Sequence, residues 1–193
     1  MLFNGISIIT GKVFTRPFLI LFLKGLIHLS LTAQTIELPI SNDGKVEYFK
    51  TVEPDSINYF ALWENATTFL RSLSVPDQLT KDVQCNAQLT KLEHQFGFYL
   101  YVKPTLTKQI DGVMMADITI NVEEKKYQYT IHNFQFIKYA RNRFGQFVPK
   151  SSKKYPLELY YPNSNKKTWK AHFEEINSKI LKFQHNLELK MSE

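Results

Sequence analysis

The chain has 193 residues, of which 44% are hydrophobic and 22% are charged, a composition that suits one folded domain and excludes a wholly disordered chain. Its single cysteine, Cys85, excludes an intrachain disulfide and, with only scattered histidines beside it, a thiolate zinc site. The formal net charge of +6 favours an anionic partner only if the basic residues remain in the functional chain.

The first 33 residues have the layout of a secretory signal peptide. Lys12 and Arg16 form a basic start, apolar stretches follow, and Ala33 supplies a small residue directly before Gln34. We therefore expect residues 1–33 to be a signal peptide that is cleaved near Ala33–Gln34. Residues 34–193 would then form a single exported domain in the periplasm or the extracellular space.

Two features leave alternatives open at this end of the chain. Lys24 interrupts the apolar run, and Leu31 is a poor residue three positions before the cut. A membrane anchor is one alternative, although the interrupted run falls short of the roughly 20 apolar residues that a spanning helix needs. A native start downstream of Met1 is another. Cleavage would remove three basic residues and no acidic ones, which leaves 21 basic against 18 acidic residues and a net charge of +3.

The first elements after this segment are two short extended stretches and a helix. Residues 36–40 and 46–52 read as extended, on either side of the turn residues 41–44. Pro54 ends the second stretch. From Ile57 to Leu73 apolar residues recur every three or four positions, which predicts an amphipathic helix.

The middle of the chain predicts a sheet with one apolar face. Apolar and polar residues alternate over residues 83–90, 96–103 and 114–122, and Cys85 falls on the apolar phase, as an inert core thiol would. The next strand starts at Tyr127 and changes phase after Ile131. One extra residue restores the facing of a strand, so we expect a bulge near His132 and Asn133.

The end of the chain predicts an irregular segment and a second helix. Residues 139–163 read as a basic, aromatic insertion containing several prolines, and residues 164–190 as a helix. Its apolar residues step by four, three, four, three and four: Trp169, Phe173, Ile176, Ile180, Phe183 and Leu187. Bulky aromatic residues in this stripe favour packing on a sheet over a coiled-coil seam.

With these elements in this order, the sequence resembles exported proteins of Bacteroidetes that carry a domain of unknown function with a fold like that of the TATA-binding protein (TBP). The resemblance covers roughly residues 36–138 and the last helix. It rests on an opening segment, a helix and a hairpin: Leu38-Pro39-Ile40 with Asp43-Gly44-Lys45-Val46-Glu47-Tyr48; Leu62-Trp63 with Phe69-Leu70; and Ile118–Val122 with Tyr127–Phe134. It implies an α+β fold in the order β-α-β-β-β-β-α, a curved antiparallel sheet of about five strands with two helices packed on one face. It implies no activity, and the long basic segment after Tyr139 departs from the family pattern.

If helices cover the apolar face, the other face collects hydrogen-bonding side chains. These are Gln84, Asn86, Gln88, Tyr99, Tyr101, Asp117, Thr119, Asn121, Gln128 and Thr130. Such a face could bind an extended polymer or peptide, or it could simply be solvated. We take Tyr99, Tyr101, Asp117 and Asn121 from it as candidate ligand-binding residues.

His132 and Asp117 form the only acid–base pair that the predicted strands could bring together. Neither lies in a catalytic motif, and the sequence contains no GxGxxG, GxxxxGK[ST], HExxH or GxSxG. We therefore assign no catalytic residue, metal ligand or cofactor, and keep His132 as a candidate ligand-binding residue. Hydrolysis of an envelope polymer by His132 and Asp117 remains the alternative.

Positive charge is concentrated in residues 138–167, which hold eight basic residues and one acid, a balance of +7, while the rest of the mature chain sums to −4. Aromatic residues are interleaved with them. The candidate ligand-binding residues here are Arg141, Arg143, Lys153 and Lys154, and a soluble surface loop is the competing interpretation.

The sequence thus predicts an exported, non-enzymatic binding or envelope-associated module. Its partner would be an anionic envelope polymer, a peptide or a membrane surface, with nucleic acid not expected. An interaction protein that oligomerises through an edge strand or the last helix is a further alternative.

Overall fold

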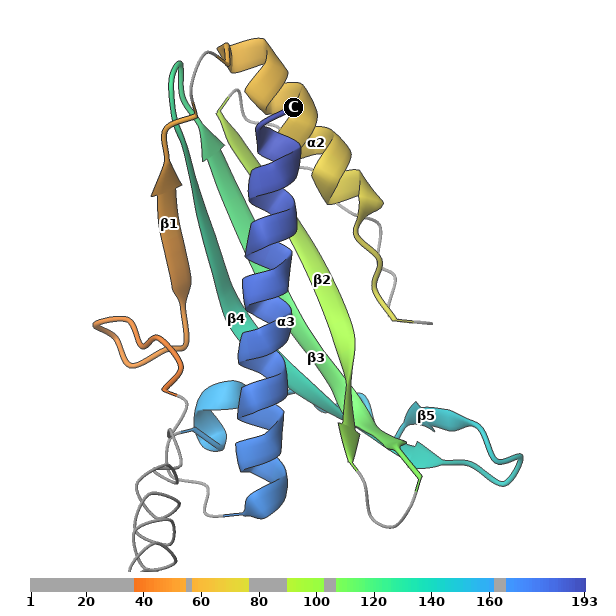
Figure 1. The fold of residues 1–193 in the computed structure, drawn as a ribbon. Coiled ribbons are helices and arrows are strands. Elements are labelled where there is room, and N and C mark those ends of the chain that lie inside the picture. Colours follow the sequence, from red (N-terminus) through yellow and green to blue (C-terminus); the bar gives the residue numbers. More distant parts are fainter. Residues whose placement is uncertain (1–36, 55–56, 77–89, 103–106, 162–165) are drawn as a thin grey trace, which may run out of the picture. The chain divides into compact units, whose positions relative to one another are not determined.

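The computed structural model describes residues 37–54, 57–76, 90–102, 107–161 and 166–193 (Figure 1). Residues 36–193 form one compact unit. The expected signal peptide and the extended segment at residues 83–90, with Cys85, Gln84, Asn86 and Gln88, lie outside the described residues, apart from Thr90.

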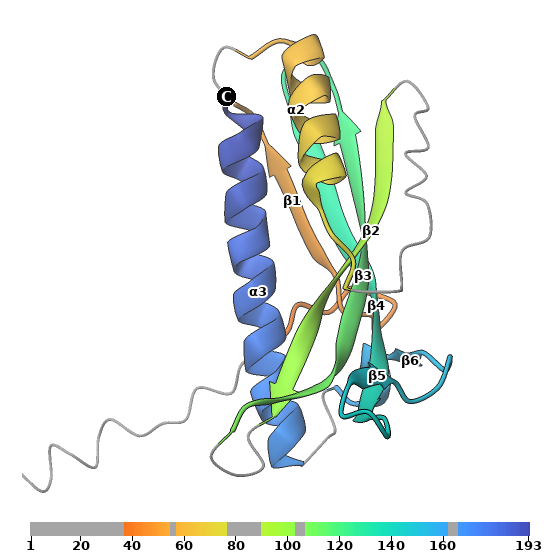
Figure 2. The ribbon, with the colours of Figure 1, turned by 90° about the vertical axis from the view of Figure 1, so that its right-hand side faces the viewer.

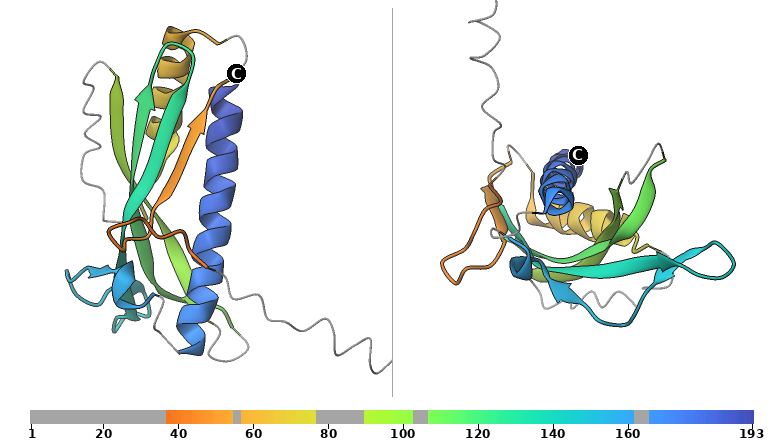
Figure 3. Two further views of the ribbon diagram at one scale, coloured as in Figure 1. Left: turned by 90° about the vertical axis from the view of Figure 1, so that its left-hand side faces the viewer. Right: turned by 90° about the horizontal axis from the view of Figure 1, so that it is seen from below.

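The described residues form a six-stranded antiparallel sheet and two α-helices. In chain order the elements are β1 (Tyr48–Val52), α2 (Tyr59–Ser72), β2 (Lys91–Val102), β3 (Gln109–Val122), β4 (Tyr127–Arg141), β5 (Phe147–Pro149), β6 (Tyr155–Pro156), the 3-10 helix η1 (Leu157–Leu159) and α3 (Lys167–Met191). The strand order is β1-β4-β3-β2, and β5 and β6 pair with the C-terminal half of β4. Both α-helices lie on the same face of the sheet (Figures 2 and 3), so the predicted α+β class is confirmed.

The helices bury the stripes that their periodicity predicts. Asn58 caps α2 by accepting the N–H of Ala61 at 3.0 Å, and the buried side chains of α2 follow at helical spacing. On α3, the ring of Phe183 stacks on Phe96 of β2, with ring centres 4.4 Å apart. Leu187 is fully buried. The stripe of α3 therefore packs inside the domain, as expected, and does not form an open coiled-coil seam.

The predicted bulge in β4 is confirmed. Met115 pairs with Gln135 and Asp117 pairs with His132, so two residues of β4 lie opposite the one residue between Met115 and Asp117. Asn133, one of the two, has a positive φ of 54°. The extra residue returns the strand to register, so that the aromatic residues after it again face the helices.

A second bulge, in β3, was not predicted. Leu100 pairs with Gly112 and Tyr101 with Ile110, which leaves Asp111 as the extra residue. Glycine is required next to it, because a Cβ at position 112 would overlap the carbonyl oxygen of Ile137 and the ring of Phe136.

Two sequence-based expectations are wrong. The face of the sheet away from the helices is not polar throughout, because Val113, Met115, Ile137 and Tyr139 form a second buried cluster with Tyr99 against it. Residues 139–163 are not irregular throughout, because β4 continues to Arg141 and turns back as β5. The alternation of buried and exposed residues in β4 continues to Arg141, into the segment where proline and basic residues suggested a loop.

The two short extended stretches expected on either side of residues 41–44 meet at one antiparallel bridge, between Ile40 and Val46, just before β1.

Within the described part of the chain, neither α-helix combines the length and the apolar content needed to cross a membrane.

Candidate functional site

Asp117 and His132 lie opposite each other in the register of β3 and β4, but their side chains bond to other residues. The two carboxylate oxygens of Asp117 accept hydrogen bonds from Gln95 Nε2 at 2.8 Å and from Asn133 Nδ2 at 2.6 Å. The Nε2 atom of His132 instead lies 3.3 Å from the hydroxyl of Thr119. The predicted acid–base pair is therefore a set of amide and hydroxyl contacts on the helix-free face of the sheet. Asn121 lies further along β3, opposite Lys91 and Gln128.

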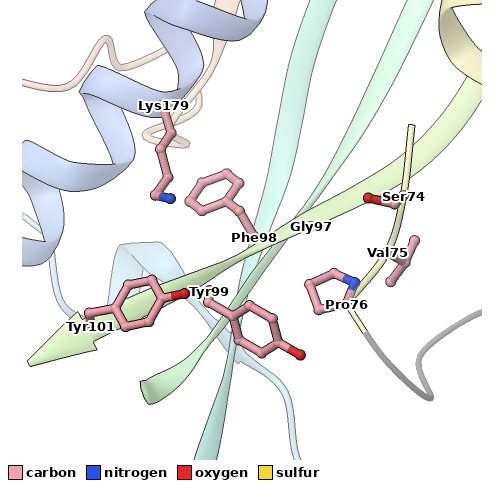
Figure 4. Close-up of a pocket in the computed structure, with 8 residues that line it drawn as sticks. All are labelled: Ser74, Val75, Pro76, Gly97, Phe98, Tyr99, Tyr101 and Lys179. Atoms are coloured by element: carbon pink, nitrogen blue, oxygen red, sulfur yellow. The ribbon is translucent and has the colours of Figure 1, made fainter. Parts of the chain in front are cut away.

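Tyr99 and Tyr101 line a cavity at the edge strand β2 (Figure 4). Its volume is about 420 Å³, and its walls come from three elements: Ser74, Val75 and Pro76 after α2; Gly97, Phe98, Tyr99 and Tyr101 of β2; and Lys179 of α3. The Nζ atom of Lys179 lies 5.5 Å from the ring centre of Phe98 and 6.0 Å from that of Tyr101. The cavity thus joins aromatic rings with one ammonium group.

Gly97 allows this cavity to form. A Cβ at this position would lie 2.6 Å from Met115 Sδ and 3.2 Å from Pro76 Cδ. Only a residue without a side chain lets Pro76 lie directly on the strand and form one wall.

A larger cavity, of about 940 Å³, adjoins the first turns of α3. Its lining combines aromatic, basic and acidic side chains with a few small residues: Tyr101, Val102, Lys108, Asp111, Phe136, Lys138, Tyr160, Lys166, Lys167, Thr168, Trp169, Ala171 and Glu175. Tyr101 lines both cavities, and Lys108 Nζ lies 4.0 Å from the centre of its ring. We call the two cavities together the Tyr101 groove.

The acidic side chains of the Tyr101 groove are already committed to protein partners. Glu175 accepts the backbone N–H of Tyr101 at 3.2 Å through one oxygen and lies 3.7 Å from Lys179 Nζ through the other. Asp111 contacts Lys138 and His172. Lys108, Lys166 and Lys167 are exposed, and the described residues show no ion pair for them. The groove therefore presents uncompensated positive charge.

A buried histidine holds Asp111 in place. His172 is fully buried, and its Nε2 lies 3.0 Å from Asp111 Oδ2. Burial alone would raise the pKa of the Asp111 carboxyl, but the hydrogen bonds from His172 and Lys138 outweigh it and hold the pKa below its ordinary value. Sequence reasoning missed this cluster, because the bulge that turns Asp111 toward α3 leaves no mark in the alternation of β3.

The basic candidates lie elsewhere. Arg141 and Arg143 belong to the β4–β5 hairpin, and their guanidinium groups lie over Phe147 and Phe144 at 5.2 and 4.8 Å. Lys153 and Lys154 lie in the loop before β6, and Lys153 Nζ is 4.9 Å from the ring centre of Tyr155. None of the four lines the Tyr101 groove. The predicted site residues thus fall into three separate groups.

Within the described residues no group of three or more histidine, cysteine, aspartate or glutamate side chains could hold a metal ion.

Comparison with known proteins places the fold. No protein-family model and no curated protein matches the chain. A solved structure of a TBP-like protein from Parabacteroides distasonis matches with a TM-score of 0.59 and 13% identity, covering 79% of this chain and 96% of that one. The chain has a TBP-like fold.

A second solved structure agrees with this fold. A DUF4468 family protein from Bacteroides ovatus matches with a TM-score of 0.50 and 10% identity, over 78% of this chain and 89% of that one. Both relatives come from Bacteroidales, so the resemblance to uncharacterised TBP-like domains of Bacteroidetes is confirmed. At these identities the likeness concerns the fold alone, and function has to be argued from the site.

Proposed function

We propose that this TBP-like protein is an exported, non-catalytic binding module that holds a stretch of acidic polysaccharide in the Tyr101 groove. The observation that carries the proposal is the position of Tyr101. Tyr101 lines both cavities, and two ammonium groups lie near its ring, that of Lys108 at 4.0 Å and that of Lys179 at 6.0 Å from the ring centre.

The chemistry of the groove suits a chain of acidic sugars. Aromatic rings offer flat apolar faces on which sugar rings stack, and exposed lysines attract carboxylates placed along the polymer. Each exposed ammonium contributes on the order of 1 kcal/mol at low ionic strength and less at physiological salt. Two adjoining cavities fit an extended segment better than one compact ligand.

The contacts of His132 and His172 favour binding over hydrolysis. His132 contacts the hydroxyl of Thr119, while the carboxylate of its neighbour Asp117 accepts from two amides. His172 has a carboxylate partner but is fully buried, out of reach of a polymer. General base catalysis needs the base within hydrogen-bond reach of its substrate.

Calorimetric titration with a galacturonate hexasaccharide tests the proposal. We expect the Lys108→Ser/Lys179→Ser double variant to bind at least about tenfold more weakly than the parent chain, the effect of losing roughly 1.4 kcal/mol. A matched control, Lys125→Ser/Lys182→Ser, removes the same charge from exposed positions outside the groove. Equal losses in the two double variants would contradict the groove as the binding site.

A ring variant separates stacking from charge. Tyr101→Phe keeps the aromatic face and should bind nearly as well as the parent chain, whereas Tyr101→Ala should not. A hexaglutamate peptide of the same charge serves as the second probe. If the peptide binds as tightly as the saccharide, the preference for sugars is wrong while the groove itself stands.

Export rests on the N-terminal sequence and is tested separately. Mass spectrometry of the native protein from fractionated cells should find a chain that starts at Gln34 outside the cytoplasm. An intact N-terminus in the cytoplasm would contradict export, and the search for a ligand would then move away from envelope polymers.

A further inference from the structure

The β4–β5 hairpin, residues 139–149, carries an exposed aromatic side chain at its tip. Figures 1 and 3 show the hairpin extending beyond the rest of the sheet. Phe144 is 71% exposed, and Arg143 lies over its ring while Arg141 lies over the ring of Phe147. A large apolar side chain held in water beside a guanidinium group calls for a physical reason.

The tip is an ordered turn. The side-chain oxygen of Asn142 accepts the backbone N–H of Phe144 at 2.9 Å and that of Gln146 at 3.0 Å. The backbone N–H of Asn142 donates to the carbonyl of Gln146 at 2.8 Å. These bonds fix the backbone on both sides of Phe144, so its exposure is built into the turn.

The surroundings of the tip carry one sign of charge. Residues 139–154 contain five basic residues and no acidic one: Arg141, Arg143, Lys150, Lys153 and Lys154. All five are exposed, and no ion pair is recorded for them within the described residues. A guanidinium over a ring keeps its N–H donors free for an oxyanion.

We propose that this hairpin docks the protein on an anionic lipid surface, with Phe144 entering the boundary between headgroups and acyl chains. Arg141 and Arg143 bind lipid phosphates, and the three lysines add long-range attraction to the negative surface. Charge alone would also suit an acidic polymer. Phe144 favours lipid, because the ring stands on a protruding tip and lines neither cavity of the Tyr101 groove, and a soft apolar layer can bury such a ring.

The docking surface is independent of the Tyr101 groove. No hairpin residue lines either cavity, so a lipid-bound protein keeps its groove open to a ligand. The two proposals can therefore fail separately.

Co-sedimentation with vesicles tests the docking. The full chain is mixed with vesicles of equal parts phosphatidylglycerol and phosphatidylethanolamine, or of phosphatidylcholine alone. Phe144→Ser should weaken binding to the anionic vesicles about tenfold, the loss expected from withdrawing one aromatic side chain from the interface. Phe60→Ser is the matched control, because Phe60 is 80% exposed on α2. Arg141→Ser/Arg143→Ser should reduce the preference for the anionic vesicles, because the three lysines alone then attract the negative surface.

A fluorescent reporter locates the hairpin whatever else binds the vesicle. Phe144→Trp should shift its emission to the blue and be quenched by lipids brominated near the top of the acyl chain, whereas Phe60→Trp should not respond. The proposal is overturned if the two tryptophans behave alike, or if Phe60→Ser lowers binding as much as Phe144→Ser. It is also overturned if the hairpin variants lose affinity only for the galacturonate probe.

Discussion

Replacing Asp111 by alanine tests whether the buried cluster with His172 and Lys138 stabilises the end of the sheet that carries the Tyr101 groove. The side chain of Asp111 is only 14% exposed, and that of His172 is 1% exposed. Truncation leaves the His172 nitrogen buried without its acceptor, which costs about 1–3 kcal/mol. The contact with Lys138, whose side chain is 46% exposed, adds at most about 1 kcal/mol because water screens it. We expect the free energy of unfolding to fall by about 1–4 kcal/mol.

The loss should depend on pH in a defined direction. The folded pKa of Asp111 lies below its ordinary value of 3.8, so the folded state favours the charged carboxylate more than the unfolded chain does. The contribution of Asp111 is therefore fully present above that ordinary value and disappears as the pH falls through the lower folded pKa. The stability gap between the parent chain and Asp111→Ala should stay constant from neutral pH down to mildly acidic pH, and should narrow below about pH 4.

Urea unfolding followed by circular dichroism measures this gap at each pH. The matched control is Lys138→Ser, which removes only the half-exposed partner and should cost less than about 1 kcal/mol. A loss in Asp111→Ala no larger than in Lys138→Ser would refute the role given to His172. A gap that widened as the pH fell would refute the direction of the pKa shift.

Four further variants, at three positions, test the fold around the sites by the same urea assay. Gly112→Ala should lose about 1–3 kcal/mol or more because the new methyl group overlaps the carbonyl of Ile137, and a loss near zero would mean that the strands can part there. Asn133→Ala should be about 1 kcal/mol less stable than Asn133→Gly, because both lose the hydrogen bond to Asp117 but only glycine accepts a φ of 54° without strain. His94 is buried, and among the described residues neither of its ring nitrogens has a hydrogen-bond partner. Burial lowers its pKa, so the unfolded chain takes up a proton more readily than the folded one. The parent chain should therefore lose stability as the pH falls through about 6.5, the ordinary pKa of histidine. His94→Phe should remove that loss, and an unchanged pH profile in this variant would contradict the assignment.

Much of the fold could be predicted from local patterns. The three-and-four spacing of apolar residues located both helices, and the alternation over residues 114–122 located β3. The phase change after Ile131 even located the bulge at Asn133. These features could be predicted because each depends on which face of one helix or strand is buried. The residues on a buried face recur at a fixed spacing along that segment, so the spacing identifies the face.

The sites were less predictable. Tyr99 and Tyr101 were expected on a polar platform. Their ring centres do lie 6.4 Å apart, but Tyr99 packs against the buried cluster of Val113 and Met115, and Tyr101 lines two cavities. His172 looked like an isolated histidine on a helix, and its partner Asp111 is 61 residues away in the chain. No spacing rule connects them.

The amino-acid sequence by itself determined the two α-helices, the strands β1 to β4 with the faces that they turn to the helices, and the concentration of positive charge after Tyr139. Only the tertiary structure decided that Asp111 contacts His172, that Lys108 and Lys179 both lie near the ring of Tyr101, and that Phe144 is exposed on an ordered turn. The physical reason is that burial periodicity is a local property of one segment. A cavity or a projecting surface depends on the register, the bulges and the packing of several segments at once, and those are settled only when the whole chain has folded.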